Sequence, residues 1–208
     1  MNSFSMFKRL ISIAFVIILS VTCFAGCGKK AVYRIDTLRY VVDGKTTVQY
    51  DYTYTYDNKP AITNATFFDG LSESYTDVYG YDEKGTMITF TKRYESSIER
   101  SYTAESITNN KYIFREEDGT EFLTIIFDQN GFIVSQRYAN GYVTEYAFTY
   151  DEKGKPLTFK QLDIRPSGSN RITDYVVEFT DKDTFRMKSV GENAQENAYY
   201  EIDCTIIK

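Results

Sequence analysis

A short turn motif recurs along this chain and constrains its fold more than any other feature. The text YDEKG occurs at 81–85 and again at 150–154, 69 residues later, and the variant FDQNG begins 23 residues before the second copy. A fourth variant, YDNKP, begins at Tyr56. Because 69 is three times 23, we interpret the chain as built on one hairpin-sized unit. In each copy the Asp can accept hydrogen bonds from the backbone ahead of it, and Gly supplies a left-handed residue. We therefore expect positive φ at Gly85 and Gly154.

A second turn signal, Asp-Gly or Asn-Gly, alternates with the first. Such dipeptides are typical of two-residue type I′ hairpins, in which both central residues have positive φ. Regular alternation of the two signals predicts that each kind of turn lies at one end of a sheet of consecutive antiparallel hairpins. The predicted structural turn residues are Asp57, Asp82, Gly85, Asp128, Gly131, Asp151 and Gly154 for the first kind, and Asp43, Gly44, Asp69, Gly70, Asp118, Gly119, Asn140 and Gly141 for the second.

The segments between these turns have the pattern of β-strands. Residues 49–56 alternate strictly between polar and aromatic side chains, and the whole chain contains 19 Tyr and 15 Phe, which favour half-buried pleated surfaces. The turn spacing predicts an all-β fold, an antiparallel meander of about 14 strands. An open twisted sheet rarely exceeds about ten strands. We therefore expect the sheet to roll into a barrel or a half-barrel, or to fold over into two layers.

The first 30 residues have the features of an export signal. Lys8 and Arg9 precede an apolar run of 15 residues, 10–24, which is short for a spanning helix and suits a signal peptide. The text FAGC at 24–27 then resembles the lipobox of bacterial lipoproteins, with Phe24 where Leu is usual. The resemblance implies cleavage between Gly26 and Cys27 and a diacylglyceryl, palmitate-bearing lipid on Cys27. Cys23 is a competing lipid site, and a plain secretory signal or an uncleaved anchor is the alternative.

These features divide the chain into three parts. Residues 1–26 are the expected signal peptide, 27–32 a lipidated N-terminus with a short tether, and 33–208 a single all-β repeat domain. The expected location is the extracytoplasmic face of a cell membrane, with the N-terminal lipid as the membrane contact. Cys204 is the one cysteine left in the domain, so we expect no internal disulfide and an inert thiol packed in a strand.

The first turn motif resembles the YD repeat of RHS-type bacterial proteins. The resemblance covers four units within residues 50–160. Those repeats form extracellular hairpins in curling sheets, and such proteins often bind carbohydrate or enclose cargo. The Arg that usually follows the Gly is Thr86, Phe132 or Lys155 here, and the first copy has Pro60 in place of Gly. We carry over only the hairpin chemistry from this family, and no enzymatic role.

The amino-acid composition argues against several classes of function. The chain has no His, and removal of Lys8 and Arg9 leaves 22 basic against 29 acidic residues. Without a basic stripe a nucleic-acid partner is not expected. We found no nucleophile motif, phosphate loop or metal-spaced cluster, so we predict no enzyme activity, no cofactor and no metal. Single Asp residues in separate turns would not supply the six to eight oxygens that Ca²⁺ needs.

The predicted function is therefore that of a non-catalytic binding or surface-interaction module. Its candidate ligand is a glycan, a lipid or a protein. The residues proposed to stack on a ligand are Tyr50, Tyr52, Tyr54 and Tyr56, for which packing in the core is the competing interpretation. A carrier or chaperone that shelters a lipid or an apolar peptide is the alternative function, followed by a carbohydrate-active enzyme.

Overall fold

The structure is a computed structural model that describes residues 32–55, 60–108, 111–127, 133–152, 155–191, 194 and 196–207. The predicted signal peptide and the lipid site at Gly26 and Cys27 lie outside the described residues. The same holds for five predicted turn or stacking residues: Tyr56, Asp57, Asp128, Gly131 and Gly154. Within the described part, no helix is long and apolar enough to cross a membrane.

Fourteen antiparallel strands form the described chain, which confirms the predicted fold class and strand number. The strands are β1 (Val32–Val42), β2 (Lys45–Tyr54), β3 (Pro60–Phe67), β4 (Tyr75–Tyr81), β5 (Met87–Tyr94), β6 (Glu99–Thr108), β7 (Lys111–Arg115), β8 (Glu121–Phe127), β9 (Ile133–Tyr138), β10 (Val143–Tyr150), β11 (Pro156–Ile164), β12 (Asn170–Phe179), β13 (Thr184–Val190) and β14 (Ala198–Ile207).

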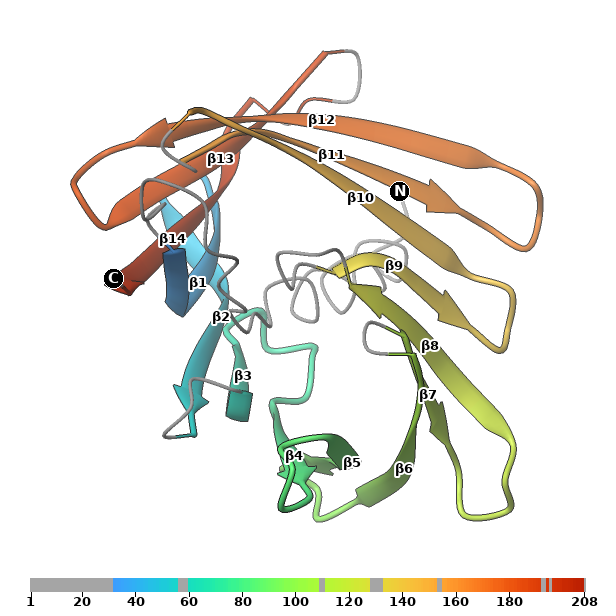
Figure 1. Cartoon of the computed structure of the whole chain (residues 1–208). Coiled ribbons are helices and arrows are strands. Elements are labelled where there is room, and N and C mark those ends of the chain that lie inside the picture. Colours follow the sequence, from blue (N-terminus) through green and yellow to red (C-terminus); the bar gives the residue numbers. More distant parts are fainter. Residues whose placement is uncertain are drawn as a thin grey trace.

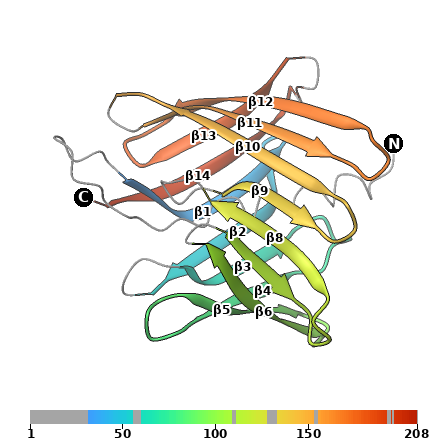
Figure 2. The ribbon, with the colours of Figure 1, turned by 45° about the vertical axis from the view of Figure 1, so that its right-hand side comes forward.

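The sheet closes into a barrel, which is one of the three shapes expected from the sequence. Every strand pairs with its neighbours in sequence, and β1 pairs with β14 over ten residue pairs from Val32↔Ile207 to Val42↔Ala198. Figures 1 and 2 show the ring of strands from blue β1 round to red β14. On the outer face of this seam, Arg39 Nη1 lies 2.7 Å from Asp203 Oδ2 and 3.5 Å from Glu201 Oε1. Closure removes the exposed edges that an open sheet of this size would have.

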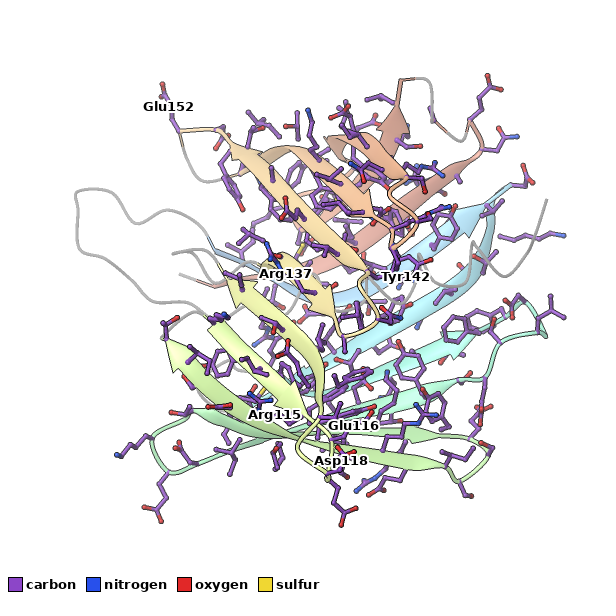
Figure 3. The ribbon with its side chains drawn as sticks, turned by 90° about the vertical axis from the view of Figure 1, so that its right-hand side faces the viewer. Arg115, Glu116, Asp118, Arg137, Tyr142 and Glu152 are labelled. Carbon is purple, nitrogen blue, oxygen red and sulfur yellow. The ribbon has the colours of Figure 1, made fainter. Side chains whose placement is uncertain are left out.

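The up-and-down order gives the barrel two distinct ends. Val32 and Ile207 lie at one end, here called the near end, together with the turns at 82–86, 151–155 and 180–183. The opposite end, the far end, carries the turns at 43–44, 68–74, 95–98, 116–120, 139–142 and 165–169. Figure 3 shows Glu152 at one end of β10 and Tyr142 at the other, on the side where Glu116 and Asp118 lie. The prediction that the two turn signals lie at opposite ends is thus confirmed for the described turns.

Aromatic side chains fill much of the interior. In β2 the inward positions Val48, Tyr50 and Tyr52 are buried, whereas the outward Thr53 is exposed. Rings from successive strands contact one another, as for Phe90 and Tyr102, whose centroids lie 5.6 Å apart. The alternation of strand side chains thus places one face of every strand in a common core. The largest fully buried side chains are Tyr50, Phe90, Phe114, Phe159, Leu38, Leu123, Ile125, Ile202, Gln136 and Val48.

The four aromatic-Asp hairpins share one register feature. In each, the last residue pair joins residues six apart, after an irregularity in the pairing. Asp82 Oδ1 accepts hydrogen bonds from the backbone N–H of Lys84 and Thr86, and Asp151 Oδ1 accepts one from Lys155. The copies that begin at 81, 127 and 150 therefore occupy equivalent places, whereas in the first hairpin the equivalent position is Tyr54, two residues before the motif at 56–60. The final pairs are Tyr54↔Pro60, Tyr81↔Met87, Phe127↔Ile133 and Tyr150↔Pro156.

The prediction of type I′ turns at the Asp-Gly and Asn-Gly dipeptides was wrong for three of the four. Only Asp43 and Gly44 both have positive φ, +50° and +74°. At 116–120 and 138–142 only the Gly is left-handed, and its N–H bonds the carbonyl three residues back, as Gly85 does to Asp82. Such a three-residue loop with Gly in the left-handed position is the next commonest hairpin. The residue before Gly cannot reveal which loop forms, because Asp and Asn suit both.

The third of these exceptions, Asp69-Gly70, lies in a longer connection, 68–74. Here Asp69 Oδ1 accepts hydrogen bonds from the backbone N–H of Leu71 and Ser72. Conversely, the turn at 94–98 has the three-residue form with a serine in the left-handed position, Ser97 at φ +67°. The absence of Gly made this turn less visible in the sequence.

Substitution of a turn glycine tests the repeat directly. Gly85 has φ +75°, as predicted, and a β-branched residue is disfavoured in that region. We expect Gly85→Val to lower the free energy of unfolding by about 1–2 kcal/mol, measured by urea denaturation. Glu83→Ala, an exposed position in the same turn, should cost less than about 0.5 kcal/mol. Equal losses in the two variants would contradict this account of the turn.

Candidate functional site: a buried ion pair in a tyrosine-lined interior

Among the described residues, one pair of opposite charges lies inside the barrel. Asp77 of β4 and Lys92 of β5 are direct cross-strand partners. Asp77 lies between the buried Tyr75 and Tyr79 on the inward face of β4, so its carboxylate points into the core. Lys92 Nζ is 2.7 Å from Asp77 Oδ1, and the two side chains are 11% and 2% exposed. Among the ion pairs of the described residues, this is the one in which both side chains are buried.

Aromatic rings surround the ammonium group. Lys92 Nζ lies 3.2 Å from the centroid of the Tyr75 ring and 5.8 Å from that of Phe90. A cation over an aromatic face is attracted by the negative charge of that face, by up to about 2 kcal/mol when water is excluded. The Tyr75 ring therefore stabilises the charged form of Lys92 together with the carboxylate.

Burial shifts both groups toward their neutral forms. Desolvation raises the pKa of Asp77 to about 6, although the charge and hydrogen bond of Lys92 act in the opposite direction. Desolvation likewise lowers the pKa of Lys92, against the attraction of Asp77. The same physical cause acts on both partners, because neither charge has bulk water to solvate it. The pair is thus held together by mutual attraction at a considerable cost of desolvation.

Tyrosine hydroxyls gather around this pair. Burial raises the pKa of each, and the charge of Asp77 raises it further. One of these residues, Tyr138, belongs to β9, five strands away from β4 around the barrel. The charge of Asp77 therefore acts on a tyrosine of a distant strand as well as on those of its own and neighbouring strands. The tyrosines affected in this way are Tyr50, Tyr52, Tyr75, Tyr79, Tyr94 and Tyr138.

A second polar group faces inward from β9, β10 and β11. The Tyr146 hydroxyl donates to Gln136 Oε1 at 3.3 Å. Gln161 Nε2 donates to both carboxylate oxygens of Asp163 at 3.0 Å, and Thr144 Oγ1 donates to Asp163 Oδ1 at 3.2 Å. Gln136 is fully buried and Gln161 nearly so. The interior thus combines a tyrosine-rich core with two hydrogen-bonded polar clusters.

The proposed stacking tyrosines lie in this interior. Tyr50 and Tyr52 are buried and Tyr54 is half-buried, and the Tyr54 hydroxyl donates to the carbonyl of Ile35. In this position the three rings pack in the core, which is the competing interpretation given above. Their role in stacking on a ligand stays a prediction that nothing here tests, and Tyr56 is not among the described residues.

The described part of the chain holds no group of three or more His, Cys, Asp or Glu side chains placed to bind a metal ion. Cys204 is buried in β14, and burial raises the pKa of its thiol to about 12. That thiol is therefore protonated and unreactive at neutral pH.

A carboxyl group of raised pKa beside a lysine is also what an acid–base catalyst requires. This pair is the best candidate for chemistry that the described residues offer. However, with its side chains 2% and 11% exposed, a substrate could reach it only after the barrel opened. The geometry therefore favours a structural role for the pair.

The ion pair was missed by sequence reasoning, although a signal existed. In the text YTDVYGY the alternation places Asp77 on the same face as Tyr75 and Tyr79, and in FTKRY it places Lys92 with Phe90 and Tyr94. A charged residue within an aromatic stripe indicates a buried charge that needs a partner. If the two strands are paired through the turn at 82–86, Asp77 and Lys92 become direct cross-strand neighbours.

Comparison with protein-family models found no match to this chain, and comparison with curated proteins found none either. The likeness to lipoproteins and to YD repeats therefore rests on the residues quoted for it.

Proposed function

We propose that this protein is a membrane-anchored extracytoplasmic lipoprotein whose barrel is a non-catalytic binding or surface-interaction module. The supporting observation is the position of the chain's N-terminal side. Cys27 lies five residues before Val32, and Val32 lies at the near end of the barrel. A lipid on Cys27 would hold the near end close to the bilayer. The loops of the far end would then face away from the membrane, where a ligand could reach them.

Metabolic labelling tests the anchor. Cells that produce the full-length protein are grown with radiolabelled palmitate, and the protein is then isolated. We expect label in the wild type and in Cys23→Ala, and none in Cys27→Ala, because the thioether forms only at the lipobox cysteine. The Cys27→Ala protein should also leave the membrane fraction. Equal labelling of Cys27→Ala, or no label in the wild type, would overturn the proposed anchor.

A carrier function is the second candidate. Its guest would be a lipid or an apolar peptide, and the supporting observation is the large number of aromatic side chains on the inner face of the barrel. Native mass spectrometry of the purified protein distinguishes the two functions. A bound guest of defined mass supports a carrier, whereas unliganded protein supports interaction through the outer surface.

A further inference from the structure

Two adjoining loops at the far end expose large apolar side chains. Phe68 and Leu71 belong to the connection between β3 and β4, and Ile98 to the turn between β5 and β6. Their exposed fractions are 58%, 79% and 54%. Single exposed apolar residues are ordinary, but a group of them on neighbouring loops marks a contact surface. We call Phe68, Leu71 and Ile98 the rim patch.

Hydrogen bonds hold the two loops of the rim patch together. The backbone N–H of Glu95 donates to the carbonyl of Ser74 at 3.2 Å, and the backbone N–H of Ser96 donates to the Glu73 carboxylate. The first loop is also joined to β2, since the Phe68 N–H donates to the Thr47 carbonyl at 2.9 Å. A partner would therefore meet side chains on an ordered backbone, which lowers the entropic cost of binding.

The two loops of the rim patch, 68–74 and 95–98, contain three carboxylates and no Lys or Arg, although Arg93 and Arg100 lie on the adjoining strands. The described residues of the far-end turns, 43–44, 68–74, 95–98, 116–120, 139–142, 165–169, 191, 194 and 196–197, contain eight carboxylates and one arginine. The near-end turns 82–86, 151–152, 155 and 180–183 contain six carboxylates and three lysines. Hydrogen bonds from Ser96 lower the pKa of Glu73, and those from Thr120 lower that of Asp118. These carboxylates are therefore charged at neutral pH.

From this arrangement we infer that the rim patch is a docking surface for a protein segment that carries apolar side chains beside lysines or arginines. Its orientation toward such a partner rests on the anchoring proposed above. A second copy of this chain is disfavoured as the occupant, because two acidic rims would repel each other. An anionic membrane is disfavoured by the same repulsion and because the far end would point away from the anchoring bilayer.

A defined peptide tests this inference. The full-length protein is placed in nanodiscs of zwitterionic lipid, with protein-free nanodiscs as the blank. The probe is a fluorescent ten-residue peptide with four lysines and two leucines, and its anisotropy reports binding. Two control peptides replace the lysines by glutamates or the leucines by serines. We expect the probe to bind at low salt, to lose affinity as salt is raised, and to bind far better than either control peptide.

Variants then locate the binding surface. Leu71→Ser with Ile98→Ser should weaken binding of the probe about tenfold or more. The matched control is Leu157→Ser, which removes a 46%-exposed leucine next to the near-end turn at 151–155 and should leave binding unchanged. Equal binding by the rim variant and the wild type, or equal binding of the glutamate peptide, would overturn the inference. So would self-association through the patch in sedimentation analysis.

The outcome is separable from that of the anchoring proposal. Peptide binding is measured on the protein with or without its lipid, whereas palmitate incorporation does not involve the rim. Lipidated protein that does not bind the probe would contradict only the docking surface. Wild-type protein that incorporates no palmitate but binds the probe would contradict only the anchor.

Discussion

Lys92→Met is expected to destabilise the protein strongly at pH 7 to 8, by about 3–5 kcal/mol. Methionine retains the volume and the contact with the Tyr75 ring, but it leaves the Asp77 carboxylate buried without its cation. The free energy of unfolding, measured by urea denaturation, reports the loss.

The pH dependence of this loss of stability follows from the direction in which burial shifts the pKa of Asp77. Burial raises the pKa of Asp77 above its unfolded value, so the folded state binds a proton more readily than the unfolded state. The stability contributed by the protonated carboxyl is therefore fully present below the unfolded pKa and is lost as pH rises through the folded pKa, near 6 in the wild type. Removal of Lys92 should raise that pKa further. The defect of Lys92→Met should accordingly shrink as pH falls toward 4.

A double variant serves as the control. Asp77→Leu with Lys92→Met replaces the ion pair by apolar side chains of similar size, a change that is often neutral or stabilising. We expect this variant to recover most of the stability at pH 7 and to lose the pH dependence that belongs to the pair. If Lys92→Met were as stable as the wild type at pH 7, or if its defect grew at low pH, the buried pair would not have the role described.

Phe90→Ala is the second large effect, with an expected loss of about 3–5 kcal/mol. The Phe90 ring is fully buried and lies 5.5 Å from Tyr79, 5.6 Å from Tyr102 and 5.9 Å from Phe114 between ring centroids. Its removal would leave a cavity among three rings that cannot close around it, and thermal or urea unfolding would show the decrease.

Ile88→Ala in the same strand is the matched control. Ile88 is 43% exposed, so its truncation should cost less than about 1 kcal/mol. Equal losses for the two variants would mean that the interior and exterior faces of β5 had been assigned wrongly.

The fold was largely predictable because its signals are local. The turns at 82–86 and 151–155 are visible as text, and the alternation at 49–54 gives both strand and face. Closure was not predictable in the same way, since pairing of Arg39 with Glu201 joins residues far apart in sequence. The prediction of the turn types was wrong for a local reason. A dipeptide such as Asp118-Gly119 suits more than one kind of hairpin loop.

The candidate site was less accessible to sequence reasoning. The aromatic stripe of β2 indicated Tyr50 and Tyr52, whose exposure depends on which face of the strand turns inward. Asp77 and Lys92 look like ordinary surface charges until their strands are paired. Their importance arises from burial, which only the closed sheet provides.

Closure of the barrel is the central claim, because the two ends, the buried ion pair and the rim patch all depend on it. Amide hydrogen exchange tests it most directly. In a closed barrel the amides of β1 and β14 that bond across the seam, such as those at Arg39↔Glu201 and Val41↔Tyr199, should be protected as strongly as those between β11 and β12. Rapid exchange of the seam amides, with slow exchange elsewhere, would show an open sheet with two free edges and would contradict the account.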